Sequence, residues 1–192
     1  ARLSQALHKA TQDFHLPPGA EMRPVLDPLD GFPYRFDAVA HADHGAIREV
    51  LTRGQIVIDR LYAQQKPIPI HHDLHFSNVR RTKTGLAVFD FDDCRLGHPA
   101  QDIGVTMFYL RRTAYDPALE AAYRAEFEAW PGDLTEDDLE TLMACRQVLL
   151  ANDLIASITA DLQAEVQQYV QTTNSRLHYF LRTGRFEPRA VT

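Results

Sequence analysis

Two short stretches of the chain carry most of the side chains that could do chemistry. Residues 71–78 read His-His-Asp-Leu-His-Phe-Ser-Asn, and residues 88–93 read Val-Phe-Asp-Phe-Asp-Asp. Transfer of a phosphoryl group from ATP to a hydroxyl needs a carboxylate to accept the hydroxyl proton and oxygen ligands to hold Mg²⁺ on the phosphates. Asp73 can be that carboxylate, and Asn78 and Asp90 can supply the oxygens. Oxygen ligands of this kind suit Mg²⁺ better than zinc or copper.

Short strands are predicted to position these side chains. The apolar runs at residues 68–70 and 86–89 indicate two strands that flank a loop, and Thr84-Gly85 is a turn signal between them. Asp73 and Asn78 then lie in the loop, and Asp90 lies just after the second strand.

Helical patterns surround this small β region. Residues 43–65 repeat helically, with Gly54 as a weak position in the middle, and helical repeats return beyond Pro99. Five prolines between residues 17 and 33 exclude a continuous helix or central strand there. The sequence therefore predicts an α+β domain that is predominantly α-helical, with a small β-hairpin insertion.

A helix is also expected at the beginning of the chain. Its predicted apolar stripe follows three- and four-residue steps. The stripe consists of Leu3, Ala6, Leu7, Ala10 and Phe14.

Composition excludes several classes of protein. The 192 residues include 20 Lys and Arg against 26 Asp and Glu, a formal net charge of −6, which argues against nucleic acid as a partner. No apolar run approaches the ~18 residues that a membrane span needs, and no signal peptide is evident, so we expect a cytoplasmic protein without a membrane partner. The two cysteines, Cys94 and Cys145, have no C-x-x-C spacing and receive no role.

The order and spacing of these motifs resemble the aminoglycoside phosphotransferase and choline kinase-like enzymes, which share the protein kinase fold. Their signature reads H-G-D-L-H-x-x-N, then a short hairpin, then I-D-F/W, and about a dozen residues later an aspartate that opens a helix. Residues 71–78 and 88–93 fit the first two parts, and Asp102 lies twelve residues beyond Asp90. The form Phe-Asp-Phe-Asp-Asp-Cys is most similar to the branch with type II homoserine kinases and bacterial stress-response kinases.

The resemblance implies a role for each of these residues. Asp73 would be the catalytic base, Asn78 and Asp90 would be Mg²⁺ ligands, and His71 and Asp102 would support the loop. The implied reaction transfers the γ-phosphate of ATP to a hydroxyl of a small molecule such as an amino alcohol, an aminoglycoside or a sugar. A protein Ser/Thr kinase of the same superfamily is an alternative.

Several neighbouring residues have two interpretations. Asp92 could contact the metal or cap the turn after the strand. His71 is expected to hydrogen-bond loop backbone, and His75 to support the loop or to face the substrate. Asp102 could be a helix N-cap, which is compatible with loop support. His72 replaces the family's usual glycine.

One part of the family pattern has no counterpart in this sequence. It contains no glycine-rich loop of the type G-x-G-x-x-G and no lysine in a V-A-I-K-like strand. From the resemblance we therefore expect residues 1–192 to correspond to a C-terminal, catalytic lobe, with the N-terminal nucleotide-binding lobe absent from them. Apolar surface is expected where that lobe would pack, and it could drive formation of a homodimer.

Two other classes of protein fit parts of the pattern. A metal phosphohydrolase of the HD type would use His41 or His44, His72-Asp73 and Asp102 as ligands of a transition metal. Pro67 and Pro69 argue against it, because they keep His72-Asp73 out of a helix interior. The other class is a non-catalytic, kinase-like lobe that binds a ligand or partner without turnover.

Overall fold

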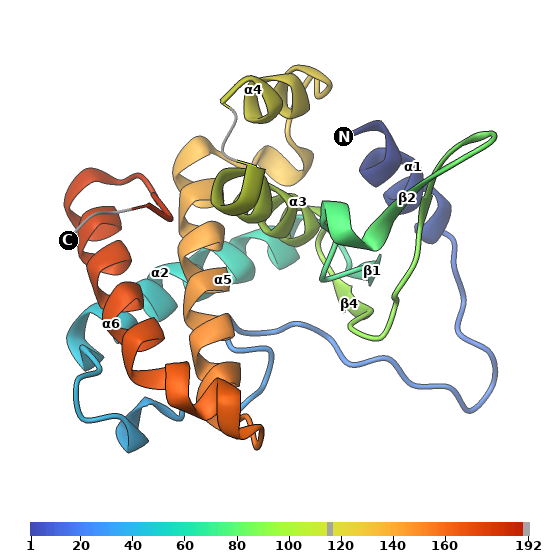
Figure 1. Ribbon diagram of the computed structural model, residues 1–192. Coiled ribbons are helices and arrows are strands. Elements are labelled where there is room, and N and C mark those ends of the chain that lie inside the picture. Colours follow the sequence, from blue (N-terminus) through green and yellow to red (C-terminus); the bar gives the residue numbers. More distant parts are fainter. Residues whose placement is uncertain (115–116, 190–192) are drawn as a thin grey trace. The chain divides into compact units, whose positions relative to one another are not determined.

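The computed structural model describes residues 1–114 and 117–189, so the last three residues of the predicted lobe lie outside the description. The chain forms two compact units, which we describe separately: Ala1–Val25 with Asp59–Thr135, and Leu26–Ile58 with the described residues from Glu136 on. The helices are α1 (Arg2–Thr11), α2 (His44–Gln64), α3 (Pro99–Tyr109), α4 (Pro117–Ala125), α5 (Glu136–Ala156) and α6 (Ala160–Thr183), and the strands are β1 (Ile68–Ile70), β2 (Val79–Thr82), β3 (Gly85–Val88) and β4 (Arg95–Gly97) (Figure 1).

The strands of the first unit form two separate antiparallel pairs. β1 pairs with β4, and β2 pairs with β3 as a hairpin. Both predicted strands are present as β1 and β3, but they do not pair with each other. The sequence pattern does not reveal β2, because three of its four residues are polar, or β4, which has only three residues.

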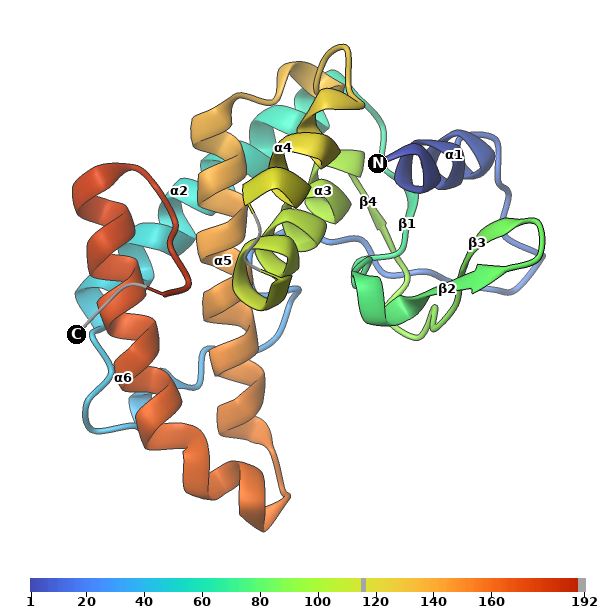
Figure 2. The ribbon, with the colours of Figure 1, turned by 45° about the horizontal axis from the view of Figure 1, so that its top comes forward.

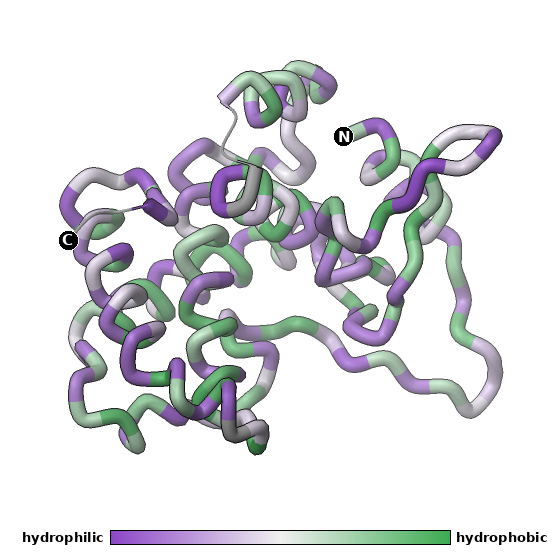
Figure 3. The backbone as a smooth tube through the Cα atoms, viewed as in Figure 1, coloured by the Kyte–Doolittle hydropathy of each residue, from purple (hydrophilic) through white to green (hydrophobic). Residues whose placement is uncertain are grey.

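The turn of the β2–β3 hairpin lies away from β1 and β4, as both ribbon views show (Figure 2). Its residues are almost all exposed, and its first strand and turn are hydrophilic (Figure 3). Gly85 follows the turn with a φ of 142°, a value that side chains rarely allow. The hairpin therefore adds little to the core, and its structural effect is to join residues 71–78 to residues 89–93.

Helix α1 buries a different face from the one that the sequence predicts. Ser4 and His8 are the buried residues, whereas Ala6 and Ala10 are exposed and Phe14 lies beyond the end of the helix, 52% exposed. The predicted apolar stripe is therefore not the most buried part of the helix, because the helix also meets polar groups of the interior. Ser4 Oγ lies 3.2 Å from the Tyr123 hydroxyl, and His8 hydrogen-bonds a buried carboxylate.

Helix α3 is the central core element of the first unit. Nearly all of its residues are buried, including Ile103, Met107 and Phe108. It begins with a capping box, in which the His98 side chain accepts the N–H of Ala100 and the Gln101 side chain accepts the N–H of His98. The N-cap is thus His98, and the prediction of Asp102 as a helix N-cap is wrong.

In the second unit, α5 and α6 lie side by side (Figures 1 and 2). Leu139, Met143 and Leu177 are fully buried there. Gly54 of α2 lets the chain pass close to α5, because a Cβ at this position would overlap Cys145 Sγ. In the described part of the chain, no helix has the length and apolar character that crossing a membrane requires.

Candidate active site

Asp73 lies in the loop of residues 71–78, which we call the Asp73 loop. Two side chains of the same loop donate hydrogen bonds to its Oδ2 atom. These are Nδ2 of Asn78 at 2.9 Å and Nε2 of His75 at 3.1 Å. His75 Nδ1 accepts the N–H of Ser77, so the ring proton is on Nε2 and points to the carboxylate. The Asp73 side chain is 20% exposed, so it is oriented by the loop and still open to a bound substrate.

Asn78 has the geometry of an oxygen ligand. Its Nδ2 also donates to the carbonyl oxygen of Asp73 at 3.0 Å, which fixes the orientation of the amide. Within the described residues, no hydrogen bond reaches Asn78 Oδ1. An oriented amide whose oxygen has no protein partner fits a place in the coordination shell of Mg²⁺.

Asp90 is placed by the hairpin. Val79 pairs with Val88, and the N–H of Phe89 donates to the carbonyl of Asn78 at 3.1 Å, so the backbone before Asp90 lies against the end of the Asp73 loop. Asp90 is exposed and has a φ of 65°, in the left-handed region. Its carboxylate makes no hydrogen bond or ion pair with any residue that the structure describes, so its oxygens are available to a ligand.

Asp92 does not cap the turn that follows β3. A backbone hydrogen bond from Cys94 to Phe91 closes that turn, and the Asp92 carboxylate is exposed. Of the two interpretations of Asp92, contact with a metal is the one that stays open.

His71 is a structural part of the loop. The residue is fully buried, its Nδ1 accepts the N–H of Asp73 at 3.3 Å, and its Nε2 donates to the carbonyl of Phe89 at 3.0 Å. The ring also lies on Phe91, with 4.8 Å between the ring centroids. His71 therefore joins the two motifs through hydrogen bonds to backbone.

Asp102 holds the beginning of the loop through its fully buried carboxylate. Oδ2 accepts the N–H of His71 at 3.0 Å, and Oδ1 accepts the N–H of His72 at 2.6 Å. His8 Nε2 donates to Oδ2 at 2.9 Å. Burial alone would raise the pKa of Asp102, but these hydrogen bonds outweigh it and the pKa lies below its ordinary value. His8 is a site residue that the sequence pattern does not reveal.

His72 turns the loop at the position where the family has glycine. Its φ is 63°, a left-handed value at which glycine has no steric cost. His72 and Asp90 are thus two non-glycine residues held in strained backbone near one site, which is common at functional sites.

A cavity of about 520 Å³ lies behind the Asp73 loop in the first unit. Its wall is mostly apolar and includes Leu74, Phe76, Leu86 and Tyr123. His75 also lines it, and its ring stacks on Tyr109 with 4.2 Å between centroids. The cavity contacts the Asp73 loop through Leu74, His75 and Phe76, and Asp73 is not among its lining residues.

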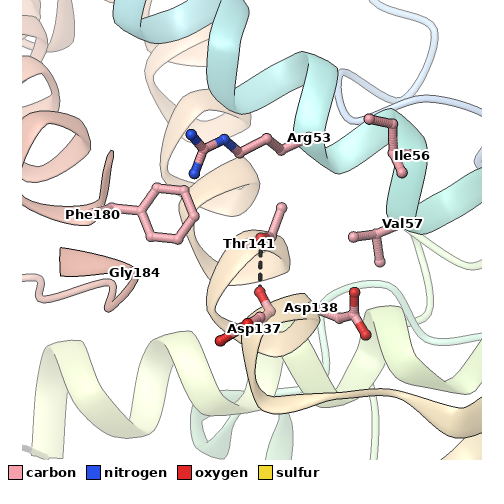
Figure 4. A pocket seen from close by; sticks show the side chains of 8 residues that line it. All are labelled: Arg53, Ile56, Val57, Asp137, Asp138, Thr141, Phe180 and Gly184. Carbon is pink, nitrogen blue, oxygen red and sulfur yellow. Dashed lines mark hydrogen bonds between the residues drawn. The ribbon is translucent and has the colours of Figure 1, made fainter. Parts of the chain in front are cut away.

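The second unit has a separate cavity of about 300 Å³. Arg53 of α2, Asp137 and Asp138 of α5, and Phe180 of α6 surround it (Figure 4). It contains none of the predicted site residues.

The oxygen ligands that Asn78 and Asp90 offer fit Mg²⁺, and the described residues do not fit a transition-metal site of the HD type. Among residues 1–114 and 117–189, no three His, Cys, Asp or Glu side chains lie close enough to hold a metal. An HD-type site would need such a group, and Asp102 instead binds the backbone of His72. Mg²⁺ in phosphoryl-transfer enzymes takes one or two protein oxygens, with waters and substrate phosphates completing its shell. Asn78 and Asp90 can provide these two.

Comparison with known proteins assigns the chain to a family. Residues 1–145 match the phosphotransferase enzyme family, APH. The chain belongs to this family. The match confirms the resemblance found in the sequence motifs, while the homoserine kinase branch stays a prediction.

Solved structures of three kinases have a similar fold. A microcompartment-associated aminopropanol kinase aligns with 97% of this chain at a TM-score of 0.65 and 22% identity. Choline kinase LicA from Streptococcus pneumoniae aligns with 92% of it at a TM-score of 0.58 and 11% identity. Amicoumacin kinase hAmiN, in complex with AMP-PNP, Ca²⁺ and Ami, aligns with 88% of it at a TM-score of 0.57 and 16% identity.

These alignments cover only part of the other proteins. The chain spans 62% of the aminopropanol kinase and of the choline kinase, and 55% of the amicoumacin kinase. No curated protein sequence matches the chain. The comparisons therefore give this chain the protein-kinase-like APH fold over the shared part.

Proposed function

We propose that this chain is the C-terminal, catalytic lobe of an ATP- and Mg²⁺-dependent phosphotransferase that acts on a hydroxyl of a small molecule. Family membership and the small-molecule kinases among the structural neighbours support this reaction class. The observation that carries the proposal is the pair of hydrogen bonds from Asn78 and His75 to the Asp73 carboxylate.

In the proposed reaction, Asp73 orients the acceptor hydroxyl and receives its proton. The acceptor oxygen forms a bond to the γ-phosphorus, the bond from that phosphorus to the β–γ bridging oxygen breaks, and ADP leaves with the electron pair. Asn78 and Asp90 would hold Mg²⁺, which when bound neutralises charge on the phosphates. The protein then contributes mainly positioning and charge stabilisation.

Exposed apolar side chains beside the site support the interpretation as one lobe of a larger enzyme. Phe76 is 51% exposed, Leu86 58% and Phe91 46%. A further lobe that binds the nucleotide would cover such side chains, because large apolar groups near a functional site are typical of surfaces that another part covers.

The test is an assay of ADP release with Mg²⁺-ATP and a panel of hydroxyl acceptors: choline, aminopropanol, homoserine and an aminoglycoside. The protein that carries this chain should turn over at least one of them. Asp73→Asn should lower kcat by about 10²–10⁴-fold, because it removes the proton acceptor and keeps the shape of the side chain.

Asp93→Asn is the matched control, because it makes the same chemical change at an exposed aspartate close to Asp90. It should keep the activity of the unaltered protein. Wild-type turnover in Asp73→Asn would refute the role of the base. Nucleotide binding without transfer to any acceptor would favour the non-catalytic alternative.

A further inference from the structure

We propose that His8 is a positioning residue of the Asp73 loop, which it holds through Asp102. This inference rests on the proposed function, because it assigns His8 the task of keeping the catalytic base in place. His8 lies on α1, more than sixty residues before the loop in the sequence. It does not touch Asp73.

The hydrogen bonds form a continuous connection from His8 to the base. His8 Nε2 donates to Asp102 Oδ2 at 2.9 Å, and the same oxygen accepts the N–H of His71 at 3.0 Å. The ring of His71 then accepts the N–H of Asp73 at 3.3 Å. A displacement of the Asp102 carboxylate would therefore move the backbone that presents Asp73.

His8 supplies a donor that Asp102 needs. The carboxylate is fully buried, and an ionised carboxylate in that position is costly unless its oxygens accept several hydrogen bonds. Among the residues that the structure describes, its donors are the amides of His71 and His72 and the ring of His8. The two amides belong to the loop itself, so among the described residues His8 is the hydrogen-bond donor to this carboxylate that lies outside the loop.

Burial makes the position of His8 well defined. The residue is 7% exposed, and the oxygen it donates to can only accept, so the proton must be on Nε2. The ring also lines a cavity of about 380 Å³, with Lys9, Gln12 and Phe127 among the other lining residues. Because the ring also contacts Asp102, its removal would extend this cavity toward the carboxylate.

Two amide variants separate positioning from a general loss of packing. In His8→Gln the side-chain amide nitrogen reaches about the place of Nε2, whereas in His8→Asn the same group is one methylene too short. His15→Asn is the control, because His15 is exposed and lies beyond the end of α1.

The first measurement is hydrogen exchange of the His71 and His72 amides, followed by NMR. The protection factors of both amides should be unchanged in His8→Gln. In His8→Asn they should fall by at least about tenfold. Equal protection of these amides in the wild type, His8→Gln and His8→Asn would overturn the proposal. This readout needs no substrate, so it decides the role of His8 even if the protein proves to have no phosphotransferase activity.

The second measurement is steady-state kinetics with whichever acceptor of the panel the protein phosphorylates. His8→Asn should lower kcat by about 10- to 100-fold and leave KM nearly unchanged, which is the usual effect of losing a residue that positions a catalytic group. His8→Gln should keep most of the wild-type kcat. A rise in KM without a fall in kcat would contradict a positioning role.

Chemical rescue gives a third readout. His8→Ala should lose activity and regain part of it when imidazole is added, because the cavity lets imidazole reach Asp102. Imidazole should not affect His15→Asn. A variant that folds, as shown by its circular dichroism, but shows no rescue at any imidazole concentration would count against the proposal.

Discussion

Acidification should destabilise the protein through His98. This histidine is fully buried at the beginning of α3, and its Nδ1 accepts the N–H of Ala100 at 3.1 Å. Burial first, and the nearby His8 second, lower the pKa of His98 from 6.5 to about 4. A protonated ring would also lose the acceptor atom that caps the helix.

The direction and size of this change in the free energy of unfolding follow from the difference in the pKa of His98 between the folded and unfolded states. Between pH 6.5 and about pH 4 the unfolded chain binds a proton at His98 and the folded protein does not, so stability falls as the pH is lowered through this range. Each pH unit inside the range is worth about 1.4 kcal/mol. From pH 8 to pH 5 the free energy of unfolding should fall by about 2 kcal/mol through this one group.

Urea denaturation of the wild-type protein and of His98→Asn, at pH 8, 7 and 5, measures this effect. Asparagine keeps a side-chain oxygen for the helix cap but does not titrate. The two proteins should change in parallel between pH 8 and pH 7. Between pH 7 and pH 5 the wild type should lose about 2 kcal/mol more than the variant.

Equal losses in the two proteins would refute the reasoning, because they would show that His98 takes up its proton equally in the folded and unfolded states. A larger loss in the variant would refute it as well.

Three further predictions concern packing and the site. Gly54→Ala should destabilise the protein by about 1–3 kcal/mol in urea denaturation, because the new methyl group overlaps Cys145 and Pro28; a gain of stability, as alanine gives in an exposed helix, would contradict the close approach. Asp102→Asn should lower the free energy of unfolding by about 2–5 kcal/mol and speed hydrogen exchange of the His71 amide, since a side-chain amide cannot accept hydrogen bonds on both atoms. An unchanged exchange rate would disprove that Asp102 holds the loop backbone. Asn78→Ala should weaken Mn²⁺ binding in the presence of ATP by at least about tenfold in calorimetry, and unaltered affinity would remove Asn78 from the ligand set.

The motif residues could be predicted from the sequence because their chemistry is local. The order Asp73, Asn78 and Asp90 along a strand and loop indicates phosphoryl transfer, and the structure brings Asp73 and Asn78 into contact. It places Asp90 next to the end of the loop through the hairpin, with its side chain exposed. The helical repeat over residues 43–65 likewise predicts α2 within two residues at either end.

His8 could not be predicted because its partner is distant in the sequence. An apolar repeat indicates which face of a helix is buried only when the interior is apolar, and here α1 meets the Asp102 carboxylate and the Tyr123 hydroxyl. For the same reason Ser4 and His8 are more buried than Leu3 and Leu7 of the apolar stripe. The sequence pattern does not predict strand β2 for a related reason, since an exposed hairpin needs no alternation of apolar and polar residues.

The most direct test of the catalytic assignment is a single-turnover measurement of γ-phosphate transfer with enzyme in excess over labelled ATP and saturating acceptor, because it isolates the chemical step from product release. Asp73→Asn should slow this step by about 10²–10⁴-fold while its unfolding curve stays close to that of the wild type. A transfer rate equal to that of the wild type, in a variant that is fully folded, would contradict the account.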